Sequence, residues 1–181
     1  MPRDSRVDVV FGDLRLRPLA PEDAADLARL RQDPETMRWA HPSGCTVEEA
    51  KRAIAEADAA MRAGEAYELA IVPAASDLLL GTIVVRLYGA TRASVGYDVA
   101  PEARGRGIAT RALNAASAWA FETFPKLERL ELWIVPGNVA STRVAERTGF
   151  QREGVFRSRW ALGGELSDVV VFSLLRTDSR V

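Results

Sequence analysis

The sequence predicts an α/β (α+β) fold in which about four helices flank a mixed central sheet of about seven strands. Apolar residues alternate with polar ones in several short segments, as in strands, and recur at helical spacing between residues 107 and 124. The connections between the strands expected before residue 99 are too short for parallel crossovers, so this half of the sheet is expected to be antiparallel. A strand, a helix and a strand over residues 93–135 instead predict a parallel pair.

Length and composition indicate one domain that spans residues 1–181, because 48% of the 181 residues are hydrophobic. The 24 basic and 25 acidic residues leave a net charge of −1, which favours neither a nucleic acid nor a membrane as partner. The single cysteine allows no internal disulfide, and the N-terminal segment lacks the apolar stretch of a signal peptide. We therefore expect a cytoplasmic location.

The first predicted elements are a short strand over residues 14–19 and a helix that begins at Pro21, where proline and acidic residues suit a first turn. We expect a loop over residues 37–45. Because exposed aromatic and polar residues in loops often contact ligands, Trp39 and His41 are predicted to bind the substrate. The alternative is that Trp39 anchors the loop to the core and His41 is merely exposed.

A second helix is predicted from the capping box formed by Thr46 and Glu49, and it continues to about Ala63 before Gly64 ends it. Three strands joined by short connections then predict an antiparallel meander. They are expected at residues 68–72, 78–88 and 93–99.

The second half of the chain begins with the long helix over residues 107–124 and a strand over residues 129–135. Asn138 is a good cap for a helix that runs to about Thr148. A final hairpin is expected from strands over residues 150–159 and 166–175. The apolar residues of these strands leave a homodimer as one expectation that the sequence keeps open.

The turn before the long helix has the composition of a phosphate-binding loop. Gly105 and Gly107 allow several backbone N–H groups to approach an anion, and the helix dipole favours negative charge there. Three arginines are expected to add positive charge at the same place: Arg104, Arg106 and Arg111. The turn lacks the third glycine of a dinucleotide-binding G-x-G-x-x-G motif, and no Gly-Lys-Ser/Thr follows as in a P-loop.

Three motifs in order resemble those of the GCN5-related N-acetyltransferases (GNATs). Residues 104–109 (RGRGIA) resemble the Arg/Gln-x-x-Gly-x-Gly/Ala pyrophosphate loop, and residues 138–141 and 149–154 resemble the N-x-x-S and G-F-x-x-E-G signatures of the RimJ/RimL-like branch. The resemblance covers roughly residues 14–175. It implies the GNAT fold, with the parallel strand pair splayed at the acetyl-CoA cleft.

The resemblance also implies which residues bind acetyl-CoA, as a co-substrate and without a metal. The pantetheine arm would pair with the backbone near Val99 and contact Asn138 and Ser141. The pyrophosphate would lie on the loop and the first turn of the helix, formed by Arg104, Gly105, Arg106, Gly107, Ile108, Ala109 and Thr110.

The catalytic assignment rests on Ser141, because the tyrosine that GNATs commonly use falls at Ala145 here. In the branch the serine is thought to donate a hydrogen bond to the departing thiolate. Ser141 could equally be an ordinary residue in the first turn of a helix capped by Asn138. Some members of the branch use a glutamate as base at a position that Trp160 occupies here, so Trp160 joins Trp39 and His41 as a substrate-binding candidate and no base is identified. Structural roles are expected for Glu153 and Asp168.

The resemblance therefore implies an acetyl-CoA-dependent N-acetyltransferase that acts on a primary amine by direct attack in a ternary complex. A protein N-terminal α-amino group is the acceptor expected for the branch. One alternative is a small-molecule N-acetyltransferase whose acceptor is an antibiotic or a polyamine. The other is a non-catalytic acyl-CoA-binding sensor, which the missing tyrosine and base would suit.

Overall fold

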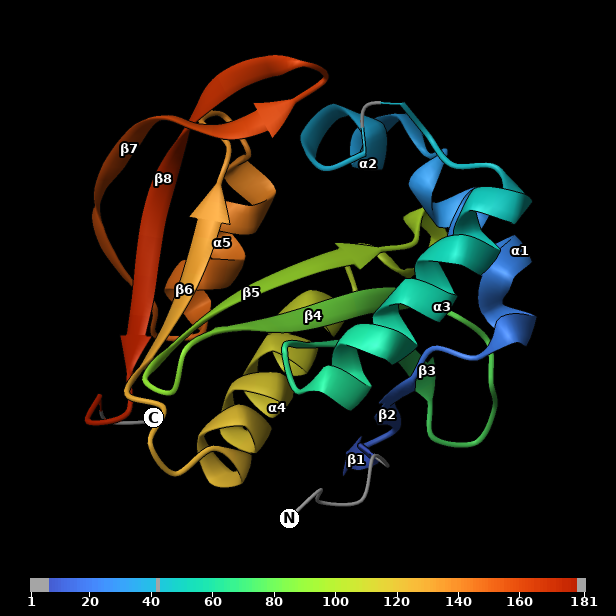
Figure 1. Cartoon of the computed structure of the whole chain (residues 1–181), viewed down its shortest axis with the longest axis horizontal. Coiled ribbons are helices and arrows are strands. Elements are labelled where there is room, and N and C mark those ends of the chain that lie inside the picture. The colour runs from blue at the N-terminus through green and yellow to red at the C-terminus, as the bar shows by residue number, and fades with distance from the viewer. Residues whose placement is uncertain (1–6, 42, 179–181) are drawn as a thin grey trace.

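The computed structural model describes residues 7–41 and 43–178, which form one eight-stranded sheet with helices on both faces (Figure 1). The strands are β1 (Val9–Phe11), β2 (Leu14–Pro18), β3 (Ala66–Pro73), β4 (Gly81–Tyr88), β5 (Arg92–Val99), β6 (Arg129–Ile134), β7 (Gln151–Leu162) and β8 (Glu165–Leu175). The α-helices of this part of the chain are α1 (Ala24–Arg31), α2 (Pro34–Trp39), α3 (Val47–Ala63), α4 (Ile108–Thr123) and α5 (Val139–Arg147).

The strand order across the sheet is β1-β2-β3-β4-β5-β6-β8-β7, and β5–β6 is the one parallel pair among these neighbours. This confirms the predicted mixed sheet with an antiparallel N-terminal half. The sheet has one strand more than predicted, because β1 pairs with β2 in the register Val9↔Leu16. Gly12 makes the turn between them with φ of +65°, and Val9 and Phe11 pack against the core.

Helix α2 corrects the expected loop, because residues 37–39 are its last turn. Its start is encoded locally: Pro34 occupies the first turn, and the Asp33 side chain accepts a 3.0 Å hydrogen bond from the Thr36 amide. The predicted capping box of α3 is confirmed, since the Thr46 amide donates to Glu49 at 2.7 Å and the Glu49 amide donates to the Thr46 hydroxyl at 3.2 Å.

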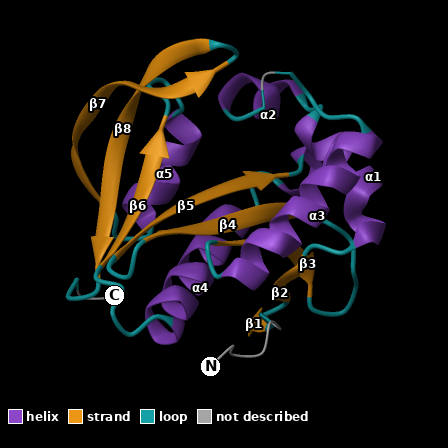
Figure 2. Ribbon diagram, viewed as in Figure 1, coloured by secondary structure: helices purple, strands orange, loops and turns teal. Residues whose placement is uncertain are grey.

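Two apolar clusters cover opposite faces of the sheet. The larger contains buried residues of α4 such as Leu113 and Phe121, and the smaller lies under α1 and α3, with Leu27 and Ile54. Figure 2 shows α3 and α4 on the two sides of the sheet. Tyr97 of β5 packs with the cluster on the α4 face. Because side chains alternate along a strand, the next residue, Asp98, lies on the opposite face.

Strands β5 and β6 separate soon after they begin, as Figure 1 shows. Their pairing is limited to residues 92–94 against 129–131. Residues 95–99 therefore keep their β4 partners on one side only, while β6 remains paired with β8 on its other side. The predicted splay of the parallel pair is confirmed, and it opens the centre of the sheet where the candidate site lies.

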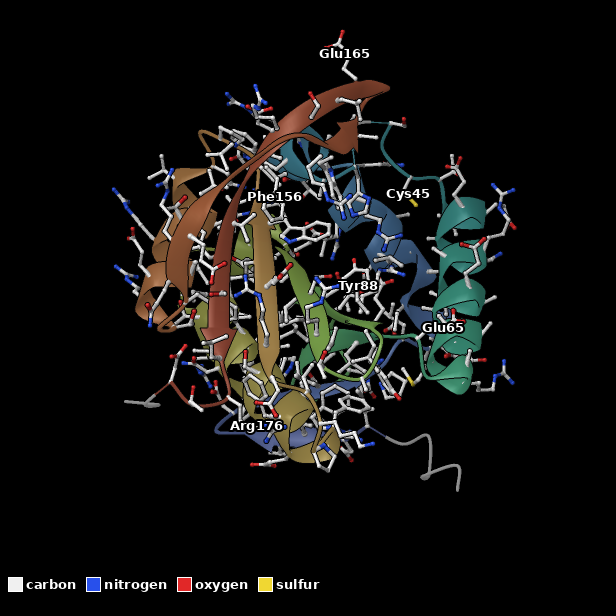
Figure 3. The ribbon with its side chains drawn as sticks, turned by 60° about the vertical axis from the view of Figure 1, so that its left-hand side comes forward. Cys45, Glu65, Tyr88, Phe156, Glu165 and Arg176 are labelled. Carbon is white, nitrogen blue, oxygen red and sulfur yellow. The ribbon has the colours of Figure 1, made fainter. Side chains whose placement is uncertain are left out.

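The C-terminal part of the sheet is held by polar contacts. Arg176 donates to the carbonyl oxygens of Phe121 at 2.9 Å and Phe124 at 2.7 Å, and Figure 3 shows it beside the end of α4. These bonds satisfy carbonyls at the helix terminus. Among the described residues, no helix is long and apolar enough to cross a membrane.

Glu153 and Asp168 have the structural roles that the sequence predicted. Glu153 accepts hydrogen bonds from the Arg129 guanidinium and, at 2.6 Å, from the Ser173 hydroxyl. Asp168 accepts a 2.9 Å bond from the amide of Ser158, a residue with φ of +47° at an irregularity of β7. Val155, Phe156 and Leu166 are exposed on this hairpin, and a homodimer through it stays a prediction.

Candidate active site

A cavity of about 940 Å³ crosses the sheet at the splay between β5 and β6. It brings together residues that lie far apart in sequence. The predicted cofactor residues that line it are Val99, Arg104, Gly105, Gly107, Ile108, Ala109, Thr110, Asn138 and Ser141, and the predicted substrate residues are Trp39, His41 and Trp160. Arg106 is the predicted residue that is not part of its lining.

The glycine loop leaves open space at the start of α4. Gly105 and Gly107 have φ of +73° and +71°, and no atom lies within 4 Å of the position that a Cβ would take at either residue. Helix α4 has no side-chain cap and no acidic residue in its first turn, whereas α2, α3 and α5 are each capped by a side chain. Its first-turn amides are therefore available to an external acceptor.

Arg104 was expected to offer positive charge to a ligand at the loop, but its charge is already paired. Arg104 lines the cavity, but its guanidinium is bound by Asp33, by the Thr36 hydroxyl at 3.1 Å and by the Val99 carbonyl at 3.1 Å. Burial alone would raise the pKa of Asp33, but the hydrogen bonds from Arg104 and the Thr36 amide hold it below its usual value. Arg104 therefore ties α2 to the loop, with its charge compensated.

The prediction that Arg111 adds charge at the cavity was wrong, and the role of Arg106, which does not line the cavity, stays a prediction. Arg111 points to the β1–β2 turn, where it pairs with Asp13. Sequence reasoning missed two other arginines, Arg143 and Arg147 of α5, which line the cavity and have no ion pair among the described residues. Their i, i+4 spacing, which places both on one stripe of a helix, was the available signal.

Asn138 caps Ser141 near a tyrosine at the opening of the splay. The Asn138 side chain caps α5 by accepting a 3.0 Å bond from the Ser141 amide. Burial raises the pKa of Tyr97 to about 12, an effect that the nearby Ser141 hydroxyl partly offsets. The two hydroxyls do not meet with the geometry of a hydrogen bond, so the buried Tyr97 Oη has no partner within the described protein. Tyr97 also lines the cavity and was missed from the sequence.

On the other face of β5, His41 has a partner that the sequence did not reveal. Its Nε2 lies 3.1 Å from Oδ2 of Asp98, and both side chains are partly buried. Trp39 does not anchor its segment in the core: its indole N–H donates to Glu35 at 2.6 Å, and its ring lies 3.8 Å from the position of a Cβ on Gly137. Helix α2 thus reaches across the cavity to the segment that follows β6.

Aromatic rings line the far end of the cavity. Tyr88 stacks on Trp133 with ring centroids 6.0 Å apart, and Trp160 meets Trp133 edge to face at 6.3 Å. Arg159 lies over the Trp133 ring, 4.4 Å from its centroid. Tyr88, labelled in Figure 3, is the last residue of β4. Tyr88 and Trp160 are each 39% exposed, so both can contact a ligand.

Comparison with known proteins identifies the family. The model of the acetyltransferase (GNAT) domain matches residues 13–151. The "Probable N-acetyltransferase YjcK" of Bacillus subtilis (strain 168) is 33% identical over 140 residues, which cover 75% of this chain and 76% of that protein.

Two solved structures share the fold. Mycobacterium smegmatis RimJ in complex with CoA-disulfide has a TM-score of 0.81 at 24% identity, covering 94% of this chain and 87% of that one. The ribosomal-protein-S5-alanine acetyltransferase of Vibrio fischeri has a TM-score of 0.80 at 23% identity, and the match covers 95% of this chain and 98% of that one. Because the family model spans most of the sequence and YjcK is related over three quarters of it, the chain belongs to the GNAT family of N-acetyltransferases.

Proposed function

We propose that the protein transfers the acetyl group of acetyl-CoA to a primary amine, by direct attack in a ternary complex. One observation carries this proposal: a single cavity joins the open N-terminus of α4, the Asn138–Ser141 cap and the His41–Trp160 end. Its two ends lie on opposite faces of the splayed sheet, so two substrates can approach one point from different sides.

The glycine loop and the splay fit acetyl-CoA. The pyrophosphate would be held by the amides of residues 105–110, where the helix dipole and the empty space around the two glycines favour an anion. The pantetheine arm would lie along the edge of β5 that β6 does not pair, near Val99, whose carbonyl also accepts a bond from Arg104, and would contact Asn138. Arg143 and Arg147, which have no ion pair among the described residues, would supply positive charge to the phosphate on the ribose of CoA. When bound, acetyl-CoA supplies an acyl group that is already activated as a thioester.

Ser141 and Tyr97 are proposed to assist the leaving group. A thiol pKa near 8.5 makes the thiolate a tolerable leaving group at neutral pH, so a hydrogen bond suffices. Ser141 donates one such bond. Tyr97 is kept protonated by its raised pKa, and its Oη can donate a second bond, in place of the tyrosine that is missing at Ala145.

The acceptor amine is proposed to enter between Trp39, His41 and Trp160. The name of one solved relative, a ribosomal-protein-S5-alanine acetyltransferase, supports a protein acceptor, and the resemblance to the RimJ/RimL-like branch supports its N-terminal α-amino group. The rings of Tyr88 and Trp160 favour an acceptor with an apolar or planar group beside its amine, which the first side chain of a peptide provides.

Release of free CoA from acetyl-CoA, measured with a panel of amines, tests the proposal. Peptides with free and with blocked N-termini are compared with polyamines and aminoglycosides. We expect release that depends on a free peptide N-terminus and a product whose mass is increased by one acetyl group. Release with the small amines alone would favour the small-molecule alternative. Tight binding of acetyl-CoA without release by any amine would overturn the proposal and favour a sensor.

A further inference from the structure

The residues assigned so far leave one role unfilled, the acceptance of the proton from the amine. An α-amino group has a pKa of about 7.7–8.0 and is mostly an ammonium ion at pH 7, which cannot attack a thioester. A base at the acceptor end of the cavity would raise the fraction of amine that can attack. The glutamate position of the branch holds Trp160, so that position supplies no base.

His41 and Asp98 stand at this end of the cavity. Both line it, with side chains that are 30% and 17% exposed, and His41 Nε2 is 3.1 Å from Asp98 Oδ2. The other ring nitrogen, Nδ1, takes part in no hydrogen bond within residues 7–41 and 43–178. A carboxylate that holds one nitrogen of an imidazole orients the ring and stabilises its protonated form, which leaves the second nitrogen free to take a proton.

Both partners are rigidly supported. Asp98 lies on β5 opposite the buried Thr82 of β4, within a continuous antiparallel ladder. His41 lies two residues after the end of α2, and its amide donates to the Thr36 carbonyl at 3.2 Å. The Arg104 guanidinium, bound to Asp33 and Thr36, fixes the start of the same helix. The positions of His41 and Asp98 are therefore both fixed by hydrogen bonds to neighbouring elements.

The pair also lies on the correct side of the sheet. Asp98 is on the face opposite to Tyr97, and Tyr97 adjoins Ser141, so the His41–Asp98 pair and the hydroxyl donors flank the splay from its two sides. Attack on a thioester carbonyl needs the amine over one face of the acyl group while hydrogen-bond donors reach the sulfur, and groups on the two sides of the splay can meet both needs. Other charged residues that line the cavity near this end are Arg31, Glu35, Glu68, Arg86 and Arg104.

We propose that His41, oriented by Asp98, is the general base that takes the proton of the acceptor ammonium. This inference rests on the proposed function. Nδ1 of His41 accepts one proton, and the amine's lone pair then forms the C–N bond as the C–S bond breaks. The second proton leaves the nitrogen as the amide forms, while the departing thiolate takes up a proton to become the CoA thiol. The imidazolium returns its proton to solvent.

The experiment compares His41→Ala, His41→Gln and Asp98→Asn with the wild type, using an amine that the wild type acetylates. His41 is the chain's one histidine, so added imidazole can replace no other side chain of that kind. We expect His41→Ala and His41→Gln to lower kcat by about 100-fold or more with KM for acetyl-CoA within about twofold. Added imidazole should raise the kcat of His41→Ala at least tenfold and leave the kcat of the wild type unchanged. The kcat of Asp98→Asn should be about tenfold below that of the wild type.

The pH dependence provides a second readout that a structural role would not change. The defect of His41→Ala should shrink as the pH rises from 7 to 9, because the amine then loses its proton to water without a base. Turnover of both His41 variants within threefold of the wild type would overturn the inference. So would a loss that imidazole does not restore and that stays constant with pH. If the wild type itself acetylates no amine, it is the proposed function that fails.

Discussion

The amide of Ser141 donates a 3.0 Å hydrogen bond to Oδ1 of Asn138, so one helix cap positions both residues assigned to the reactive end of acetyl-CoA. Asn138→Ala should lower the free energy of unfolding by about 1 kcal/mol, because the cap of α5 is lost. Asn138→Ser restores a capping oxygen without the carboxamide. Urea unfolding should show a recovered stability in Asn138→Ser, while calorimetry should show weakened acetyl-CoA binding in both variants. If acetyl-CoA binding recovered fully in Asn138→Ser, Asn138 would act only as the cap of α5 and would not contact acetyl-CoA.

Ser141→Ala should lower turnover by about ten- to 100-fold while the acetyl-CoA dissociation constant changes less than about twofold. The reason is that the hydroxyl is expected to act on the thiolate that forms during the reaction, and so to stabilise the transition state rather than the bound substrate. The amide that bonds to Asn138 is unchanged by the substitution, so the helix cap persists. Steady-state kinetics with calorimetry measure the two effects. Undiminished turnover would remove Ser141 from the mechanism.

Tyr97→Phe separates stability from activity. The buried Oη has no hydrogen-bond partner in the described protein, so its removal should leave the free energy of unfolding unchanged or slightly increased. Turnover should fall if Tyr97 is the second donor to the thiolate. Since burial raises the pKa of Tyr97 to about 12, above the usual value near 10, the folded state binds this proton more tightly. Wild-type stability should therefore decline between pH 10 and 12, and part of that decline should be absent in Tyr97→Phe.

Gly107→Glu should weaken acetyl-CoA binding by at least tenfold, because a carboxylate would occupy the anion site at the start of α4. Gly89→Glu is a matched control: Gly89 has φ of +72°, lies in the β4–β5 turn outside the cavity, and likewise has no atom within 4 Å of a Cβ position. Both variants should lose similar stability, since a glutamate is strained at positive φ. Equal acetyl-CoA affinity of the two variants, measured by calorimetry, would contradict the assignment of the loop.

Glu153→Gln should lower stability by less than about 1 kcal/mol at pH 7, since the carboxylate is 45% exposed and water screens its charge. The hydrogen bonds from Arg129 and then Ser173 lower the pKa of Glu153 to about 2, below that of the unfolded chain. Its contribution is complete above about pH 4.5 and is lost as the pH falls through 2. Urea unfolding between pH 2 and 7 should show the two proteins converge at the acid end. Glu165→Gln, at the exposed first residue of β8 and without an ion pair among the described residues, should match the wild type throughout.

Much of the backbone around the proposed anion site could be predicted because its signals are local. The positive φ of Gly105 and Gly107, the helical spacing after them and the cap at Asn138 depend on neighbouring residues, and the structure contains each of these elements. Helix α2 was missed although Asp33 and Pro34 form a good start for it, since a six-residue helix shows too little apolar periodicity to be recognised.

From the sequence we predicted the glycine loop, the family motifs and the strands and helices other than β1 and α2, because backbone conformation follows from short-range sterics, capping and periodicity. The tertiary structure alone decided which side chains meet. His41 and Asp98 are 57 residues apart, and Arg104 and Asp33 are 71 apart, so their contacts depend on the β4–β5 register and on where α2 docks. No local sequence pattern predicts that Asp98 is the partner of His41 or that Asp33 compensates the charge of Arg104, because both contacts result from long-range packing.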